Sequence, residues 1–393
     1  MPAPADRYEL CDQLGKGGTS TVWLGRRLGD KAGPEALVAI KSLLPGQDVH
    51  GDAERAFLYE ARISQCVRHP NVVPTLDVAM VGDERVMVMP YVHGVTLAAL
   101  LRSCIRNETT CPVDVAGRIV HDLLLGLDAA HRATTPEGTP LGLVHRDVSP
   151  QNVLVDASGV ARLIDFGIAK TVDSDEHTPR GEMKGKAPYL APEVLDGERA
   201  TARTDVYSAA VVLWETLCAR RLFSGRTAVD ILVAILTNPI ARPSEVLGVP
   251  VALDDVVMRG LSRSPNARPP TASDFAYEIA RSMPLASRES VAAWVRANAG
   301  EELARRELLG FYVAPRPAVP VEPRTVIMPR PAPPTTVPPP PAVGRGALVL
   351  LGLLVVASLL ATLAASVHAF ACATRAPGGS RVTTWVRPAS NGG

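Results

Sequence analysis

The sequence predicts an α+β protein in which a small strand-rich region precedes a larger helical region. Apolar runs of strand length, VWLG, ALVAIK and RVMVM, lie between residues 8 and 92, together with one helical segment from Asp52 to Val67. Amphipathic helical segments dominate residues 93–283, where loops containing Pro and Gly separate them. A change to proline-rich composition at residue 314 marks the end of the helical part.

The composition limits the classes of partner. A formal net charge of +1, from 41 basic and 40 acidic residues, provides no long-range field for nucleic acid, so we expect no nucleic-acid partner. The six cysteines include no Cys-x-x-Cys pair, which favours reduced thiols over disulfides or a zinc site. No basic stretch followed by an apolar stretch opens the chain, so we expect no signal peptide.

A glycine-rich turn lies between the first two expected strands, in the segment LGKGGTSTV at residues 14–22. Glycines let backbone N–H groups approach phosphate oxygens, because no Cβ stands in the way. An ordinary hairpin turn is the alternative for such a segment. Lys41 follows at the end of VAIK on an expected strand, where by itself it would be an ordinary exposed lysine.

The most informative stretch is VHRDVSPQNVLVDASGVARLIDFGIAK, residues 144–170. Two short apolar runs flank a Ser-Gly turn, which predicts a hairpin that brings Asn152 and Asp165 together. An amide oxygen and a carboxylate at one point suit Mg²⁺ holding a polyphosphate, and Asp147 remains free to accept a proton from an alcohol. The stretch predicts magnesium-assisted phosphoryl transfer, and a polar hairpin without chemistry is the alternative.

These motifs, HRDVSPQN followed by DFG and APE, resemble those of protein kinases, most closely the serine/threonine kinases of bacteria. The resemblance covers residues 8–283 and implies a bilobal fold, with a strand-rich N-lobe up to about residue 92 and a helical C-lobe from residue 93. It implies transfer of the γ-phosphoryl group of ATP to Ser or Thr hydroxyls of proteins, with autophosphorylation in signal transduction. Mg²⁺ is the implied metal, with Mn²⁺ as a substitute.

Two other functions stay open beside this one. The first is a pseudokinase that binds ATP and serves as a scaffold, with weak or no transfer. The second is a tyrosine kinase, which the segment Pro150-Gln151 argues against, because it has the serine/threonine form of the loop.

The resemblance also assigns the catalytic groups. Asp147 would orient and deprotonate the acceptor hydroxyl, and Lys41 would bind the α and β phosphates. Glu60 would hold Lys41 from the helix, with Glu54 as the second choice, although both could be ordinary solvated carboxylates. The implied metal ligands are Asn152 and Asp165.

The segment VMVMPYV, residues 86–92, resembles the fifth strand and the hinge of kinases. Met89 would be the gatekeeper, Pro90 would accept the adenine amine through its C=O, and Val92 would donate its N–H to the ring. Apolar residues above and below the ring could equally be ordinary core. The implied nucleotide-binding residues are Leu14, Gly15, Lys16, Gly17, Gly18, Val22, Ala39, Lys41, Met89, Pro90, Val92 and Leu154.

Three supporting roles follow from the same resemblance. Glu193 and Arg268 would form a buried ion pair, and Asp205 would brace the catalytic loop. Arg146 would pair with a phosphorylated residue of the activation loop. For that residue the candidates are Thr178, then Ser174 and Thr171, and an unmodified threonine is the alternative.

The chain departs from the kinase pattern near the acceptor. Ser149 stands where serine/threonine kinases usually have a lysine that contacts the γ-phosphate, and Lys186 stands where they usually have a threonine. Our hypothesis is that Lys186 supplies the ammonium group lost at position 149 and is therefore catalytic. Ser20 replaces the third glycine of the turn and is small enough to fit.

The chain beyond residue 283 divides into four expected segments. Residues 284–313 form a helical extension, and residues 314–346 form a proline-rich juxtamembrane linker. A proline-rich ligand for an SH3-like partner is the alternative for the linker. Residues 347–367 contain 21 consecutive uncharged residues, which predicts a transmembrane helix rather than a buried core helix. Residues 368–393 form a short tail.

The flanking arginines do not favour an N-terminus on the cytoplasmic side. We nevertheless expect that orientation, because a large N-terminal domain without a signal peptide folds in the cytosol, where ATP is. The expectation is a single-pass protein of the inner or plasma membrane, with a cytoplasmic kinase domain and an extracytoplasmic tail. A homodimer that autophosphorylates in trans is compatible with this arrangement, without a residue pattern that requires it.

Overall fold

The computed structural model describes residues 7–29, 36–44, 51–82, 84–166 and 186–312. The chain divides into two units, Met1–Ala318 and Val319–Gly393, and every described residue lies in the first. The expected linker, transmembrane helix and tail lie outside the described residues. Within the described ranges, no helix combines the length and the apolar character needed to cross a bilayer.

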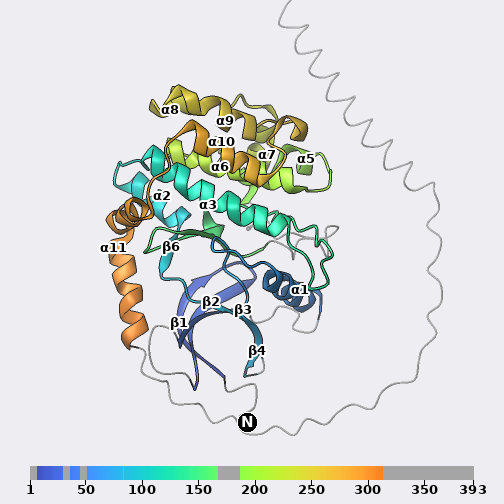
Figure 1. The fold of residues 1–393 in the computed structure, drawn as a ribbon, viewed down its shortest axis with the longest axis vertical. Helices are drawn as coiled ribbons and strands as arrows, with labels where there is room; N and C mark the ends of the chain where they lie inside the picture. Colours follow the sequence, from blue (N-terminus) through green and yellow to red (C-terminus); the bar gives the residue numbers. More distant parts are fainter. Residues whose placement is uncertain (1–6, 30–35, 45–50, 83, 167–185, 313–393) are drawn as a thin grey trace, which may run out of the picture. The chain divides into compact units, whose positions relative to one another are not determined.

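The N-terminal lobe is built on an antiparallel five-stranded sheet with the order β1-β2-β3-β5-β4 (Figure 1). Its central strands contain the apolar runs that predict strands, and Leu24, Ile40 and Val88 are fully buried. The strands are β1 (Tyr8–Lys16), β2 (Ser20–Arg27), β3 (Leu37–Leu43), β4 (Asp77–Val81) and β5 (Glu84–Pro90).

Helix α1 (Asp52–Cys66) is the one helix described in this lobe, and it confirms the helix expected over nearly the same range. Its buried face includes Phe57 and Ala61, which belong to the same apolar cluster as Met87 and Met89 of the sheet. Glu60 lies between these two apolar residues in sequence and is also buried. The amphipathic pattern therefore turns a carboxylate toward the interior.

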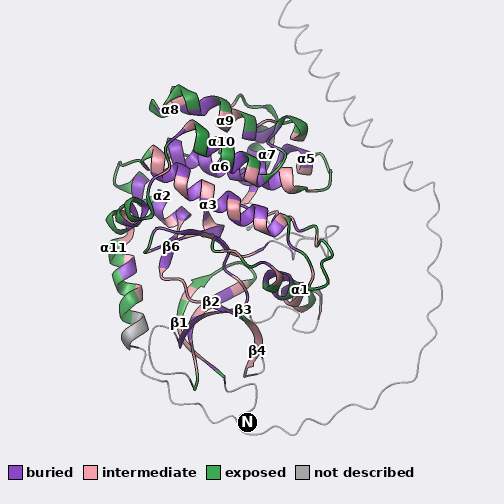
Figure 2. Ribbon diagram, viewed as in Figure 1, coloured by how far each residue is buried: buried purple, intermediate pink, exposed green. Residues whose placement is uncertain are grey.

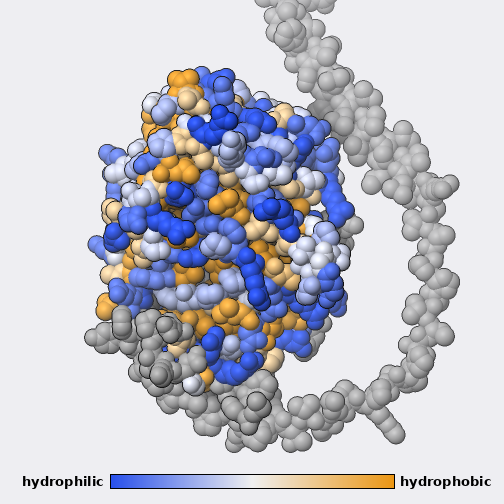
Figure 3. All heavy atoms as spheres, viewed as in Figure 1, coloured by the Kyte–Doolittle hydropathy of each residue, from blue (hydrophilic) through white to orange (hydrophobic). Residues whose placement is uncertain are grey.

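The C-terminal lobe is mostly helical and surrounds α6, which is buried along almost its whole length (Figure 2). A helix that is apolar on all sides requires such a central position. Hydrophilic residues cover much of the helical face drawn in Figure 3. The longer helices are α2 (Leu97–Arg106), α3 (Val113–His131), α6 (Ala202–Cys218), α7 (Ala228–Thr237), α10 (Ala272–Ser282) and α11 (Arg288–Tyr312). The shorter ones are α5 (Pro192–Leu195), α8 (Pro243–Leu247) and α9 (Asp254–Gly260).

A small sheet carries the hairpin that the sequence predicts. Strand β7 (Val153–Asp156) pairs antiparallel with β8 (Ala161–Leu163) and with β6 (Gly94–Thr96). The turn between β7 and β8 is closed by Asp156, whose carboxylate accepts hydrogen bonds from the N–H groups of Ser158 and Val160, both at 2.9 Å. Burial raises the pKa of Asp156, but these bonds and Arg162 outweigh it and lower the pKa overall. The predicted two-lobed α+β fold is confirmed.

Candidate active site

An ionic cluster joins the two lobes. Nζ of Lys41, on β3, lies 2.9 Å from Oε1 of Glu60, on α1, and 2.8 Å from Oδ1 of Asp165, which follows β8. The side chains of Lys41 and Glu60 are 9% and 8% exposed. The structure places Glu60 rather than Glu54 at this lysine, and Glu54 lies 3.1 Å from Arg85 instead.

The two carboxylates decide the charge of Lys41. Burial alone lowers the pKa of Lys41, but the negative charges of Asp165 and Glu60 outweigh it and raise the pKa well above its usual value. The ammonium group is therefore charged at neutral pH. Burial raises the pKa of Glu60, and the ion pair with Lys41 opposes that change. A fixed positive charge at this position can bind phosphate oxygens.

The loop that carries Asp147 is held by Asp205, at the start of α6. The carboxylate of Asp205 is fully buried and accepts the N–H groups of His145 at 2.7 Å and Arg146 at 2.9 Å. This confirms the bracing role expected for Asp205. Arg146 has a φ of 63°, in the left-handed region, so these two bonds hold a strained backbone in place.

His145 fixes the loop from its other side. Its ring is fully buried, and burial lowers its pKa, which favours the neutral imidazole. Nδ1 then accepts the N–H of Asp147 at 3.3 Å, and Nε2 faces the C=O of Ile164 at 3.4 Å. The loop is thereby connected to the residue that precedes Asp165.

Asn152 lies between the two expected acids. Its Nδ2 donates to the C=O of Asp147 at 2.7 Å and to Oδ2 of Asp147 at 3.0 Å. Its backbone C=O accepts the N–H of Ile164 at 3.0 Å, next to Asp165. Because the amide nitrogen faces Asp147, the amide oxygen Oδ1 points away from that carboxylate and is the atom left to act as a ligand.

The residues fit a divalent metal bound together with a polyphosphate. Asn152 offers an amide oxygen, and Asp165 offers the carboxylate oxygen that the Lys41 ion pair does not use. The described residues contain no group of three or more His, Cys, Asp or Glu side chains that could hold a metal. A Mg²⁺ ion here would take its other ligands from phosphate and water, as Mg²⁺ commonly does.

Lys186 contacts the same carboxylate oxygen of Asp147 as Asn152 does. Its Nζ lies 2.6 Å from Oδ2 of Asp147, and its side chain is 44% exposed, whereas that of Asp147 is 7% exposed. Ser149 is buried near the start of the same loop, and its Oγ has no hydrogen-bond partner among the described residues. The only lysine ammonium that the described part of the chain brings to Asp147 therefore comes from residue 186.

The residues expected to surround the nucleotide lie around the sheet and the hinge. The turn between β1 and β2 is exposed, and the N–H of Gly17 donates to the C=O of Ser20 at 2.8 Å. A Cβ at Gly15 would meet nothing within 4 Å, so the space beside that backbone is open. Ala39 lies opposite Met89 in the sheet. The half-buried members of the set are Leu14, Val22, Ala39, Pro90, Val92 and Leu154, whereas Lys16 and Gly18 are exposed and Met89 is buried.

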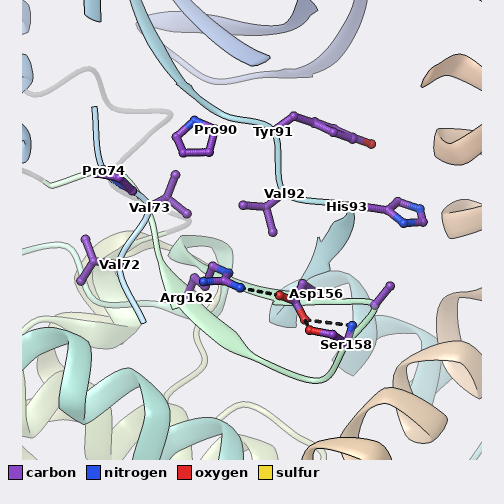
Figure 4. Close-up of a pocket in the computed structure, with 11 residues that line it drawn as sticks. Val72, Val73, Pro74, Pro90, Tyr91, Val92, His93, Asp156, Ser158 and Arg162 are labelled. Atoms are coloured by element: carbon purple, nitrogen blue, oxygen red, sulfur yellow. Dashed lines mark hydrogen bonds and ion pairs between the residues drawn. The ribbon is translucent and has the colours of Figure 1, made fainter. Parts of the chain in front are cut away.

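A cavity of about 470 Å³ lies against the hinge and the β7–β8 turn (Figure 4). The side chains of Pro90 and Val92 line it together with Arg162, which is paired with Asp156 at 2.8 Å. The contacts expected from Pro90 and Val92 to adenine are made by their backbone C=O and N–H groups and do not involve these side chains. Figure 4 also shows the ring of His93, another residue of the lining, directed toward a helix.

Two further observations concern residues that support the site. Arg268 donates to both carboxylate oxygens of Glu193, each at 2.7 Å, which confirms the expected buried ion pair. Asn71 is a support that sequence reasoning missed: it is buried, and its Nδ2 donates to the C=O of Ala161 at 2.8 Å. Its only sequence signal is a turn-forming composition, HPN, after the helix. The activation-loop candidates Thr171, Ser174 and Thr178 lie outside the described residues.

Comparison with known proteins agrees with this arrangement. The family model described as "Protein kinase domain" matches residues 8–277. Tyrosine-protein kinase MasK of Myxococcus xanthus is 33% identical over 274 residues, 70% of this chain and 42% of that protein. The probable serine/threonine-protein kinase PknB of Lactococcus lactis is 32% identical over 289 residues, 72% of this chain and 43% of that protein.

The solved structure of the PknI kinase domain of Mycobacterium tuberculosis has a similar fold. It matches with a TM-score of 0.53 at 23% identity, over 72% of this chain and all of the PknI chain. The matched part of this chain spans less than half the length of the two curated relatives above. The family match and the two-lobed fold together establish that this chain belongs to the protein kinase family, with its kinase domain over residues 8–277.

Proposed function

We propose that this chain transfers the γ-phosphoryl group of ATP to Ser or Thr hydroxyls of proteins. The observation that carries the proposal is the contact of Lys41 with Glu60 and Asp165 across the two lobes, beside Asp147 and Asn152 in mutual contact. A charged ammonium, an amide oxygen and two carboxylates with different partners are the groups that phosphoryl transfer requires.

Each group has a distinct task in this proposal. Lys41 binds the α and β phosphates, and Glu60 keeps its ammonium in place. Asp147 orients the incoming hydroxyl and accepts its proton, while the N–H of Val92 and the C=O of Pro90 bind the adenine. Mg²⁺, when bound, neutralises charge on the phosphates. Asn152 and Asp165 would hold it.

Lys186 supplies the positive charge that Ser149 cannot provide. The support is the 2.6 Å distance from Nζ of Lys186 to Oδ2 of Asp147, which puts an ammonium group at the proposed base. An acceptor hydroxyl that binds Asp147 would meet this ammonium, and so would the phosphate being transferred to it. Loss of a cation at a transferring phosphate costs a few kcal/mol, so an uncompensated Ser149 would give a slow enzyme.

The identity of the acceptor hydroxyl separates two candidate functions. PknB of Lactococcus lactis is named a probable serine/threonine kinase, which supports the proposal, and the form of the loop at Pro150 supports it too. MasK of Myxococcus xanthus is named a tyrosine kinase, which favours Tyr as the second candidate. The test must therefore identify the phosphorylated amino acid.

The test uses the whole chain with labelled ATP and Mg²⁺. We expect label on the parent protein, recovered as phosphoserine or phosphothreonine, and at least about 10³-fold less label on Asp147→Asn, because the proposed base is lost. Asp255→Asn is the matched control, because the side chain of Asp255 is 92% exposed and lies on α9 rather than on the loop of Asp147. Phosphotyrosine would replace the proposal with its alternative. Equal label on the parent and on Asp147→Asn would contradict it, and ATP binding without transfer would indicate a scaffold.

Phosphosite mapping in the same experiment tests the activation-loop candidates. Arg146 supports a phosphorylated partner, because its buried Nε has no hydrogen-bond partner among the described residues. Thr178 is the first candidate. Mixing an Asp147→Asn chain with the active parent would test phosphorylation in trans by a homodimer.

We also propose that residues 347–367 anchor the chain in the inner or plasma membrane, with the kinase domain in the cytoplasm. The support is the run of 21 uncharged residues, long enough at about 1.5 Å per residue to cross the hydrocarbon core. A chain that ends at residue 346 should move from the membrane fraction to the soluble fraction. Equal membrane association of both forms would contradict the anchor.

A further inference from the structure

Helix α11 lies along the hinge although it is outside the matched kinase domain, which ends at residue 277. Nε2 of His93 lies 3.0 Å from the C=O of Leu303, and Nη1 of Arg306 donates to the C=O of Gly94 at 2.6 Å. Figure 4 shows His93 directed toward the neighbouring helix. His93 and Gly94, which directly follow the segment 86–92 and are counted with the hinge from here on, therefore contact one helix.

The first half of α11 is fixed to the C-terminal lobe. Val291 and Val295 are fully buried, and both belong to the main apolar cluster of that lobe. Gly159, in the β7–β8 turn, has a φ of 86°, and a Cβ there would lie 2.0 Å from the C=O of Arg288. Sγ of Cys104, on α2, donates to Oδ1 of Asn298 at 3.4 Å. The start and the middle of the helix thus have set positions.

A kink in α11 changes the direction of its second half, which contacts the hinge. Ala299 has non-helical angles, with φ −145° and ψ 23°. After this kink Leu303 is 6% exposed, and the side chain of Arg306 is 18% exposed. Glu302 lies 2.7 Å from Nε of Arg306 and so leaves the outer nitrogens of that guanidinium to reach Gly94.

The hinge backbone is held from its other side as well. The C=O of His93 accepts the N–H of Ala157 at 2.9 Å, and Gly94 pairs with Asp156 in the small sheet. A Cβ on Gly94 would lie 2.5 Å from the C=O of Val155, so the approach is too close for any other residue. The residue just before these fixed positions is Val92.

We propose that Arg306 and the kinked half of α11 are positioning elements for the nucleotide. They hold His93 and Gly94 in place, so that the N–H of Val92 is positioned to donate a hydrogen bond to an adenine ring. The inference rests on the proposed function only in assigning Val92 to adenine. Because the contact acts on nucleotide binding before and during transfer alike, its loss should raise KM for ATP and leave kcat nearly unchanged.

The chain offers a matched pair of arginines for the test. Arg305 and Arg306 both contact Glu302, but among the described residues it is Arg306 that donates a hydrogen bond to the C=O of Gly94, and the side chain of Arg305 is 60% exposed. In the full chain, Arg306→Ala should weaken binding of a fluorescent adenosine triphosphate about tenfold, because a hydrogen bond from a charged group is lost. Arg305→Ala should change it less than about twofold, and Arg306→Lys should recover part of the loss.

A second variant guards against a general folding defect. His93→Phe removes the ring nitrogen that faces Leu303 and should weaken nucleotide binding in the same direction, with a nucleotide-free melting temperature near that of the parent. Equal binding by the parent, Arg306→Ala and His93→Phe would overturn the inference and leave the kinase proposal intact. No binding of nucleotide by the parent would overturn both.

Discussion

Two lysines contact different acids of the site, and their surroundings differ. Lys41 comes from a strand of the N-terminal lobe, is 9% exposed and lies between two carboxylates. Lys186 precedes a short turn of the C-terminal lobe, is 44% exposed and contacts the carboxylate of Asp147. The nucleotide side of the site is thus organised by a buried cluster, and the acceptor side by a half-exposed contact.

The difference in burial between the two lysines predicts different effects on folding stability and on phosphoryl transfer. Breaking a buried ion pair leaves an uncompensated charge in a poorly solvated place, which costs several kcal/mol of folding free energy. A half-exposed pair is screened by water and contributes little to folding. Substitution of Lys41 should therefore affect both folding and transfer, whereas substitution of Lys186 should affect transfer alone.

The largest effect is expected at the buried lysine. Lys41→Met leaves Glu60 and Asp165 side by side without their cation, and transfer should fall about 10³-fold or more because phosphate binding also loses its charge. The free energy of unfolding should fall by about 3 kcal/mol. Phosphoryl transfer and chemical denaturation measure the two effects. Loss of transfer at unchanged stability would contradict the link between burial and folding at this cluster.

A smaller effect is expected at the half-exposed lysine. Lys186→Thr should lower kcat about 10²-fold with a melting temperature within about 2 °C of the parent. Adding Ser149→Lys to that variant should restore at least about tenfold, because an ammonium group returns to the transferring phosphate. The control is Lys186→Thr with Ser290→Lys, which adds an ammonium on an exposed part of α11. An unchanged rate for Lys186→Thr would remove Lys186 from the catalytic residues.

The smallest effect on activity is expected at the buried ion pair of Glu193 and Arg268, which has no proposed contact with the nucleotide. Burial raises the pKa of Glu193, but its hydrogen bonds with Arg268, its own backbone and Thr204 outweigh this and lower the pKa overall. The native state therefore favours the ionised carboxylate. Its contribution to stability is present above the unfolded pKa of about 4.3 and is lost as pH falls below that value toward the lowered native pKa.

Glu193→Gln tests this separation of burial from chemistry. The variant should melt several degrees lower at pH 7, and its stability should decline less steeply than that of the parent between pH 5 and 3. Transfer at pH 7 and low temperature should change less than about threefold. Parallel stability curves for the two proteins across this pH range would show that Glu193 does not titrate as proposed.

The sequence predicted the central strands of the N-terminal sheet better than its edges. The three apolar runs correspond to β2, β3 and β5, the inner strands in the order β1-β2-β3-β5-β4. Strands β1 and β4 lie at the edges and are largely half-buried; β4 contains a short apolar run, VAMV, whereas β1 has none. The strand before the glycine-rich turn was expected only from that turn, and β4 was not predicted, although the lobe was recognised.

In the site, too, some features could be predicted from the sequence and others could not. Short motifs place Asp147 and Asn152 five residues apart on one loop, which local spacing can predict. The contact between Arg306 and Gly94 joins residues 212 positions apart, and neither belongs to a recognisable motif. The sequence placed Lys186 near the acceptor by its position in GKAPY, but its 2.6 Å distance to Asp147 depends on how two loops pack. Long-range packing of this kind has no signature in a single sequence.

Because the apolar face of α11 packs on the C-terminal lobe, a fragment prepared for study should include this helix. Trp294, Val295 and Leu303 belong to the main apolar cluster, yet all lie beyond residue 277, where the family match ends. A fragment cut at that boundary would expose the surfaces of α2 and α3 that this helix covers, and newly exposed apolar surface promotes aggregation. Crystallisation and inhibitor screening should begin from a fragment that extends through residue 312.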